Sequence, residues 1–179
     1  NIGMGKYTTE PAPSSKPGTY PAVLNRKSIV YISGSVRVHP DGTVSAYNAD
    51  LAENYFAVQT NIPIGTVMKV TEFNSFDVEI CNDELSICLG IISENPCFLM
   101  NNKFDDDDYL NDPHLCKVGL VGKLPVRIIG EIRKGQVIVS AGNGIARGIQ
   151  NSSEIIYKIG FANETCSKTE ERLIECIIK

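Results

Sequence analysis

Short apolar and β-branched runs alternate with turn signals along the chain from Ser28 onward. Glycine, proline, asparagine and aspartate separate the runs at the spacing typical of β-sandwiches and β-barrels. One turn is explicit at Pro40-Asp41-Gly42, because proline presets φ and glycine accepts positive φ. The expected strands are Ser28–Ser33, Val36–His39, Thr43–Tyr47, Gly65–Thr71, Phe76–Cys81, Ser86–Ser93, Lys117–Val121, Val126–Ile129, Gln136–Ser140, Ile155–Phe161 and Arg172–Ile178. The pattern predicts an all-β fold of short strands, either a barrel or a clip-like β-sandwich.

Helix signals are nearly absent. The one candidate is the stretch 49–57, where Asn48 or Asp50 could cap a short helical turn that buries Leu51 and Phe56.

The first 24 residues are rich in proline, glycine, serine and threonine, a composition that excludes a helix or a central strand. We expect an extended arm over residues 1–24 and a β-rich structural domain over residues 25–179. The arm is either a linker or a segment that lies on a neighbouring subunit, with Tyr7 and Tyr20 as anchors. The chain begins at Asn1 and not at methionine, which suggests a trimmed chain, a processed product or a fragment of a longer polypeptide.

A weak internal repeat appears when the chain is laid over itself at an offset of 70 residues. The run from Ile62 to Val70 aligns with the run from Ile132 to Val139, and each contains a glycine just before a strand. At the same offset, the run 89–92 aligns with the run 159–162. The alternatives are chance and a pseudo-symmetric β-unit.

Composition and charge exclude several classes of partner. The 179 residues carry a net charge of −4, so the basic surface that neutralises phosphates is missing, and we expect no nucleic-acid partner. No apolar stretch approaches the roughly 18 residues that span a bilayer, so we expect no membrane partner.

The six cysteines form no CxxC pair, and only two histidines could help them to bind a metal. We expect free thiols made in a reducing cytosol. Two glycosylation sequons, at Asn151 and Asn163, would indicate secretion instead, but such triplets arise easily by chance.

The usual catalytic motifs are missing, including the nucleophile elbow, the HExxH zinc motif and the Walker loop. His39 lies beside a turn and His114 follows a proline in a loop, settings typical of surface residues. We therefore expect no enzyme activity, no catalytic or metal-binding residue and no cofactor.

Negative charge is concentrated in one expected loop, in the run Asp105, Asp106, Asp107 and Asp108. Carboxylates suit hard cations, so a loop that faces a cation or a host molecule is one interpretation. The other is a solvated, mobile loop, because the spacing is not that of an EF-hand and consecutive aspartates cannot all turn inward.

Three ordered blocks resemble a module found near the C-termini of tail-fibre, tailspike and other virion structural proteins of tailed phages, especially T4-like marine and cyanobacterial phages. The blocks are Asn48–Tyr55 with Ile64–Val67, then Leu89–Pro96 with Phe98–Asn101, and then Val118–Val126 with Ser140–Ala146. The resemblance covers about residues 48–178.

The resemblance implies a virion structural protein of a tailed phage, made in the host cytoplasm and assembled as a homotrimer with other virion proteins, in a tail fibre or on the particle surface. It leaves three alternatives: a trimeric head-decoration protein, a receptor-binding tip that contacts a host glycan or protein, and a self-cleaving chaperone domain. No cleavage nucleophile can be placed on this chain. For the interface between subunits we expect Tyr7, Tyr20, Phe98, Leu99 and Met100.

Overall fold

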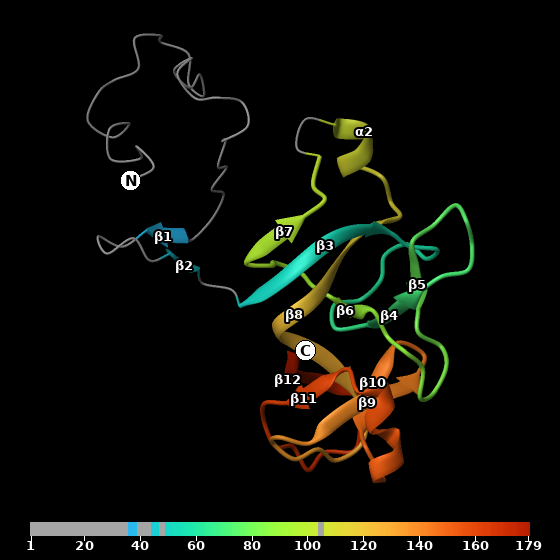
Figure 1. Ribbon diagram of the computed structural model, residues 1–179, viewed down its shortest axis with the longest axis vertical. Coiled ribbons are helices and arrows are strands. Elements are labelled where there is room, and N and C mark those ends of the chain that lie inside the picture. The colour runs from blue at the N-terminus through green and yellow to red at the C-terminus, as the bar shows by residue number, and fades with distance from the viewer. Residues whose placement is uncertain (1–35, 39–43, 47–48, 104–105) are drawn as a thin grey trace. The chain divides into compact units, whose positions relative to one another are not determined.

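The computed structural model describes residues 36–38, 44–46, 49–103 and 106–179 (Figure 1). The chain divides into two compact units, Asn1–Tyr47 and Asn48–Lys179. In the first unit, β1 (Val36–Val38) and β2 (Val44–Ala46) pair antiparallel, which confirms two expected strands. The expected arm, Tyr7, Tyr20 and the Pro40 turn lie outside the described residues.

The second unit confirms the expected all-β fold. Its strands form one ten-stranded sheet that curls on itself. Two short helical segments, α2 (Asp107–Leu110) and η2 (Ser152–Tyr157), interrupt the strands. The strands are β3 (Asp50–Phe56), β4 (Val67–Val70), β5 (Val78–Ile80), β6 (Gly90–Ile92), β7 (Phe98–Met100), β8 (Leu115–Ile128), β9 (Val137–Gly142), β10 (Ile145–Gly148), β11 (Gly160–Ala162) and β12 (Arg172–Ile178).

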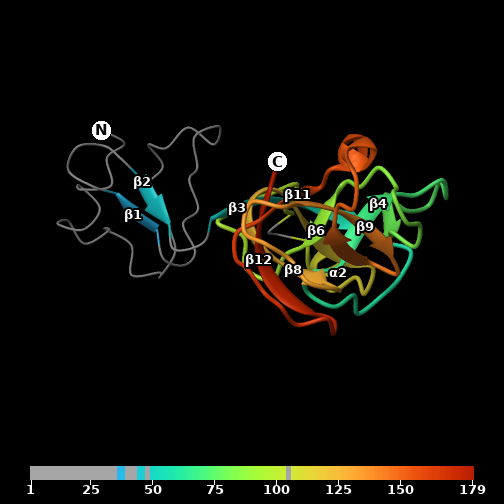
Figure 2. The ribbon, with the colours of Figure 1, turned by 90° about the horizontal axis from the view of Figure 1, so that it is seen from below.

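Five of these strands close into a barrel. The order β8, β12, β11, β9 and β10 returns to β8 through a parallel pair between Ala146 and Ile128. Figure 1 shows β9 to β12, coloured orange to red, gathered at one end of the unit, with the gold strand β8 running toward them, and Figure 2 shows the unit from that end.

A second ring of pairings uses the other half of β8. Here β3 pairs with β8, β8 with β6, β6 with β4, and β4 with β5. An isolated parallel bridge between Ala57, which follows β3, and Val78 of β5 completes the ring. The long strand β8 therefore belongs to both rings, and its Gly122 pairs with Asp50 in one ring and with Ile178 in the other.

The structure confirms the 70-residue repeat. Gly65 and Gly135 begin matching turns, with φ of 81° and 82°. Three backbone hydrogen bonds of the first copy recur in the second at the same offset. Gly65 N donates to Ile92 O, Ile92 N to Thr66 O, and Leu89 N to Met68 O. Their counterparts are Gly135 N to Ala162 O, Ala162 N to Gln136 O, and Ile159 N to Ile138 O. The two rings are thus two copies of one β-unit, with β8 as the last strand of the first and the first strand of the second.

Both rings contribute side chains to hydrophobic clusters, and several core positions correspond at the 70-residue offset. Met68 and Ile92 in the first ring correspond to Ile138 and Ala162 in the second. Val118 pairs with Ile92 as Cys176 pairs with Ala162. Burial of such side chains is the main source of stability, at about 25 cal/mol for each Å² of apolar surface.

The expected helix over residues 49–57 is wrong, because Asp50–Phe56 forms strand β3. Burial along β3 alternates with the period of a strand, but two of its buried positions are the polar residues Asp50 and Asn54. The hydrophobic pattern therefore concealed the strand. Its backbone groups find their partners on β8.

Two other expected elements differ from the structure. The separate strands Lys117–Val121 and Val126–Ile129 are parts of the single strand β8. In the expected strand Ile155–Phe161, residues 155–157 belong to η2 and only 160–161 to β11. The side chain of Asn151 caps the start of η2 by accepting a hydrogen bond from Ser153 N. Ile155 and Ile156 of η2 are exposed.

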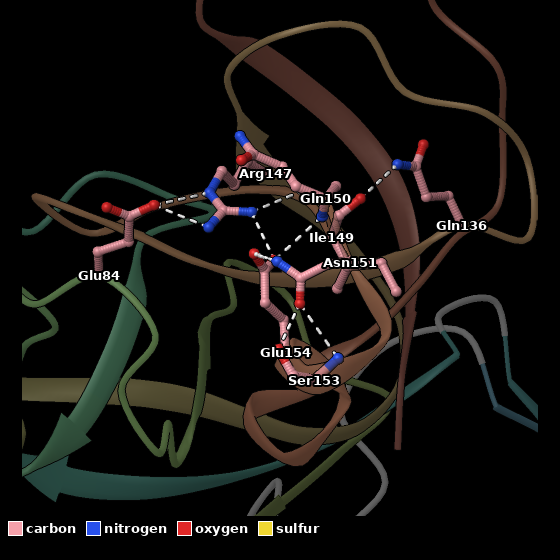
Figure 3. A network of polar contacts seen from close by, with 9 residues as sticks. Glu84, Gln136, Arg147, Ile149, Gln150, Asn151, Ser153 and Glu154 are labelled. Carbon is pink, nitrogen blue, oxygen red and sulfur yellow. Dashed lines mark hydrogen bonds and ion pairs between the residues drawn. The ribbon is translucent and has the colours of Figure 1, made fainter.

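A polar network ties the β5–β6 connection to the second ring (Figure 3). Arg147 donates to Glu84 through Nε and Nη2, at 3.0 and 2.7 Å, and to Glu154 through Nη1, at 2.8 Å. Glu154 also accepts from Gln150 N and from Asn151 Nδ2. The Arg147 guanidinium lowers the pKa of the Glu154 carboxyl, assisted by the Gln150 backbone.

We expect Arg147→Met to lower Tm at pH 7 by roughly 5 °C or more, because it leaves the nearly buried Glu154 carboxylate without its cation. A carboxyl with a lowered pKa contributes stability above its ordinary pKa and loses it as pH falls through the lowered value. The Tm difference should therefore shrink below about pH 4. Calorimetry of both proteins, with the exposed Arg133→Met as control, measures this, and equal Tm values at pH 7 would contradict it.

Candidate interaction surface

An exposed apolar row crosses the three neighbouring strands β7, β3 and β8. Leu51 of β3 pairs with Phe98 of β7 on one side and with Val121 of β8 on the other. Directly paired residues share a face of the sheet, so the three side chains lie in line. The exposed fractions are 62% for Phe98 and 52% for Val121, while Leu51 is half-buried. These three residues are called the apolar row below.

Strand β7 lies beside β3 as a parallel edge strand (Figure 1). Within the described residues it pairs with β3 alone. Phe98, Leu99 and Met100, which we expected at an interface between subunits, make up this strand. Leu99 pairs with the buried Ala52 on the face opposite to Phe98, and Met100 is half-buried. An edge strand with an exposed aromatic residue is a place where another chain can add.

The acidic loop is organised around a buried tyrosine. Tyr109 is 7% exposed, contacts Phe56 edge-to-face at 5.6 Å and donates from Oη to Asn101 O. Asp106 caps α2 by accepting from Tyr109 N at 3.0 Å. Asp107 and Asp108 are exposed, and Asp105 lies outside the described residues.

No group of three or more acidic, histidine or cysteine side chains gathers to hold a metal ion in the part of the chain that the structure describes. In the acidic loop, Asp106 caps α2, and Asp107 and Asp108 are exposed. The expected contact of this loop with a cation or a host molecule stays a prediction.

A groove of about 630 Å³ lies on the other side of β7 from the apolar row. Leu99, Leu110 and Asn102 line it together with Asn54 of β3 and Lys117 of β8. Its polar side chains have partners inside the chain: Asn54 Nδ2 donates to Asn102 Oδ1 at 3.4 Å, and Lys117 Nζ donates to Glu94 O at 3.1 Å.

His114, one of the two histidines, also lines the groove. Its Nδ1 lies 2.9 Å from Ala57 O, and its ring contacts that of Phe76 at 5.0 Å. These contacts give His114 a structural role at the closure of the first ring.

Polar residues of the first resemblance block have local roles. Asp50 is 5% exposed and accepts from Ser93 Oγ at 2.6 Å, and Glu53 accepts from Tyr55 Oη at 2.8 Å. Its burial and its hydrogen bond to Ser93 give Asp50 a structural role within this unit.

Sequence reasoning missed two members of the apolar row. Leu51 was assigned to a helix that is absent, and Val121 was treated as an ordinary strand residue. Nothing local in the sequence indicates that residues 51, 98 and 121 lie side by side.

Comparison with solved structures finds the same fold in a phage protein. The chain is similar to the C-terminal fragment of bacteriophage phi29 gene product 12, with a TM-score of 0.55 and 17% identity, over 73% of this chain and 100% of the fragment. The chain has the fold of that phage fragment. It is likewise similar to pre-mature phi29 gene product 12, with a TM-score of 0.56, 16% identity and 78% of this chain covered, and it spans 24% of the length of that protein.

No protein-family model matches the chain, and no curated protein matches it in sequence. Among the described residues, no helix has the length and apolar character needed to cross a membrane.

Proposed function

We propose that this chain is a structural component of a phage particle, of the fibre type, and that its copies assemble through the face that carries the apolar row. The observation that carries the proposal is the fold shared with the whole C-terminal fragment of phi29 gene product 12. The three sequence blocks that resemble virion proteins add to it, because they fall on β3, on β6 and β7, and on β8 to β10.

The apolar row supports assembly on physical grounds. Exposure of adjoining apolar side chains to water is unfavourable, and burying them against another chain lowers the free energy. The row ends at β7, which pairs with β3 alone within the described residues and so offers an edge to which a second chain can add. We propose a homotrimer, in which multiplicity strengthens each weak contact. The role is mechanical and needs no catalytic residue.

Phe98→Asp should convert the assembled protein to monomer, because a desolvated carboxylate at the centre of an apolar contact costs several kcal/mol. Phe73→Asp is the matched control, since Phe73 is also 62% exposed and lies in the β4–β5 connection, away from the row. Native mass spectrometry of the full chain at about 10 μM measures the result. Trimer for the wild type and for Phe73→Asp, with monomer for Phe98→Asp, is expected.

A monomeric wild type, or a Phe98→Asp protein that stays trimeric, would overturn the proposed interface.

The position in the particle separates this proposal from its rivals. Immunogold labelling of intact particles with an antibody against residues 49–179 should decorate a fibre. Labels spread over the capsid lattice would favour head decoration. Loss of host binding on shortening residues 101–115, with assembly intact, would favour a receptor-binding tip.

A further inference from the structure

Two cysteines of the first ring meet on the face that packs against the second ring. Cys81 follows β5 and Cys88 precedes β6, and both belong with the hydrophobic cluster of the second ring. Their sulfur atoms lie 3.7 Å apart, with the Cys88 thiol donating to Cys81 Sγ. Cys81 is fully buried and Cys88 is half-buried.

The segment between these cysteines holds the two rings together. Ser140 of β9 donates from Oγ to Asp83 O at 2.7 Å, and Leu85 N donates to Ser140 O at 3.2 Å. Glu84 forms an isolated bridge with Ala141 and accepts from Arg147 of β10. A covalent bond across the ends of this segment would therefore restrict the piece of chain that contacts the second ring.

We propose that Cys81 and Cys88 are a disulfide site that closes the segment 82–87 when the protein meets a small-molecule disulfide outside a reducing cytosol. A disulfide requires the two sulfur atoms to approach from 3.7 Å to about 2.05 Å. The cross-link removes conformations of the unfolded chain, and so stabilises the folded state. This inference does not depend on the proposed function.

Each sulfur has a distinct part in the reaction. Cys88, the more exposed of the two, attacks one sulfur of the small disulfide while its proton passes to Cys81 Sγ, and one small thiolate leaves. Cys81 then returns to the thiolate by releasing that proton, and attacks Cys88 Sγ to expel the second small thiolate. Starting from one thiolate and one thiol, the two cysteines lose one proton and two electrons, and the small disulfide becomes one thiol and one thiolate.

The surroundings of Cys81 suit its part. The hydrogen bond from Cys88 is the main cause that lowers the pKa of Cys81 to about 6, with help from the Ser140 hydroxyl and against the effect of burial. The same hydrogen bond, together with burial, raises the pKa of Cys88. Cys81 therefore holds the charge of the pair and can accept the proton of Cys88 as that thiol reacts.

The test uses the full chain carrying Cys97→Ser, which removes an exposed thiol. The reduced protein is treated with oxidised glutathione under native conditions, free thiols are blocked, and peptides are mapped by mass spectrometry. A peptide pair joined through Cys81 and Cys88, with a rise in Tm of several degrees that dithiothreitol reverses, is expected.

Two further variants keep the result decisive. Cys88→Ser should remove both the cross-link and the rise in Tm, and Cys116→Ser should retain both, because Cys116 lies in the other cluster. A stable glutathione adduct on Cys88 without ring closure, or Cys81 and Cys88 both free after treatment, would overturn the proposal.

Discussion

Replacing Gly122 by alanine should lower the free energy of unfolding by more than about 4 kcal/mol. Gly122 has φ of 121°, a region that side chains rarely adopt, and it is the residue of β8 that pairs with both rings. An added Cβ would lie 2.6 Å from Asp50 Cα and would also meet Ala49 O, and both of these are backbone atoms that cannot rotate away. Strain and clash together exceed about 4 kcal/mol, against a total stability of 5–15 kcal/mol for a typical domain.

Gly130→Ala is the control for Gly122→Ala. Gly130 also has positive φ, at 82°, but no atom lies within 4 Å of the position of an added Cβ. We expect a loss of only about 1 kcal/mol. Urea unfolding followed by circular dichroism compares the two variants, and a Gly122→Ala protein as stable as Gly130→Ala would contradict the shared role of β8.

Gly90→Ala and Gly160→Ala should destabilise the chain by similar amounts, about 3 kcal/mol each. The two glycines are counterparts at the 70-residue offset, and each lets its strand approach a neighbour's backbone. An added Cβ at Gly90 would lie 2.7 Å from Val118 Cγ1 and meet Gly119 O, and one at Gly160 would lie 3.0 Å from Ile177 C and meet Ile177 O.

Chemical denaturation measures this pair, with Gly135→Ala as the control, because Gly135 has positive φ but open space around it. Gly135→Ala should cost about 1 kcal/mol. If one of Gly90→Ala and Gly160→Ala were nearly neutral and the other severe, the two rings would not be equivalent copies.

Much of the fold could be predicted from local pattern. The strand Arg172–Ile178 was predicted with its observed bounds, from its run of apolar and β-branched residues. The repeat was visible because Gly65 and Gly135 fix the start of equivalent strands, where backbone conformation demands glycine. These features depend on residues close together in the sequence.

Other features depend on contacts between distant segments. Strand β3 was missed because a polar residue, Asp50, occupies one of its buried positions. Its hydrogen-bond partner there is Ser93, which is 43 residues away in the sequence. The apolar row was only partly found, through Phe98, because its other members are set by the pairing of β3 with β7 and β8. The two strands expected over residues 117–129 form the single strand β8 because of distant partners. In the sequence, Gly122 and Pro125 seem to end a strand, but Gly122 pairs with β3 and Pro125 with β12.

We propose that the chain is a structural component of a phage particle. The direct test is quantitative mass spectrometry of gradient-purified particles from an infected culture that produces this chain. We expect peptides from residues 49–179 in the particle fraction, at a constant copy number relative to the major capsid protein. Peptides that are abundant in the infected-cell lysate and absent from the purified particles would contradict it.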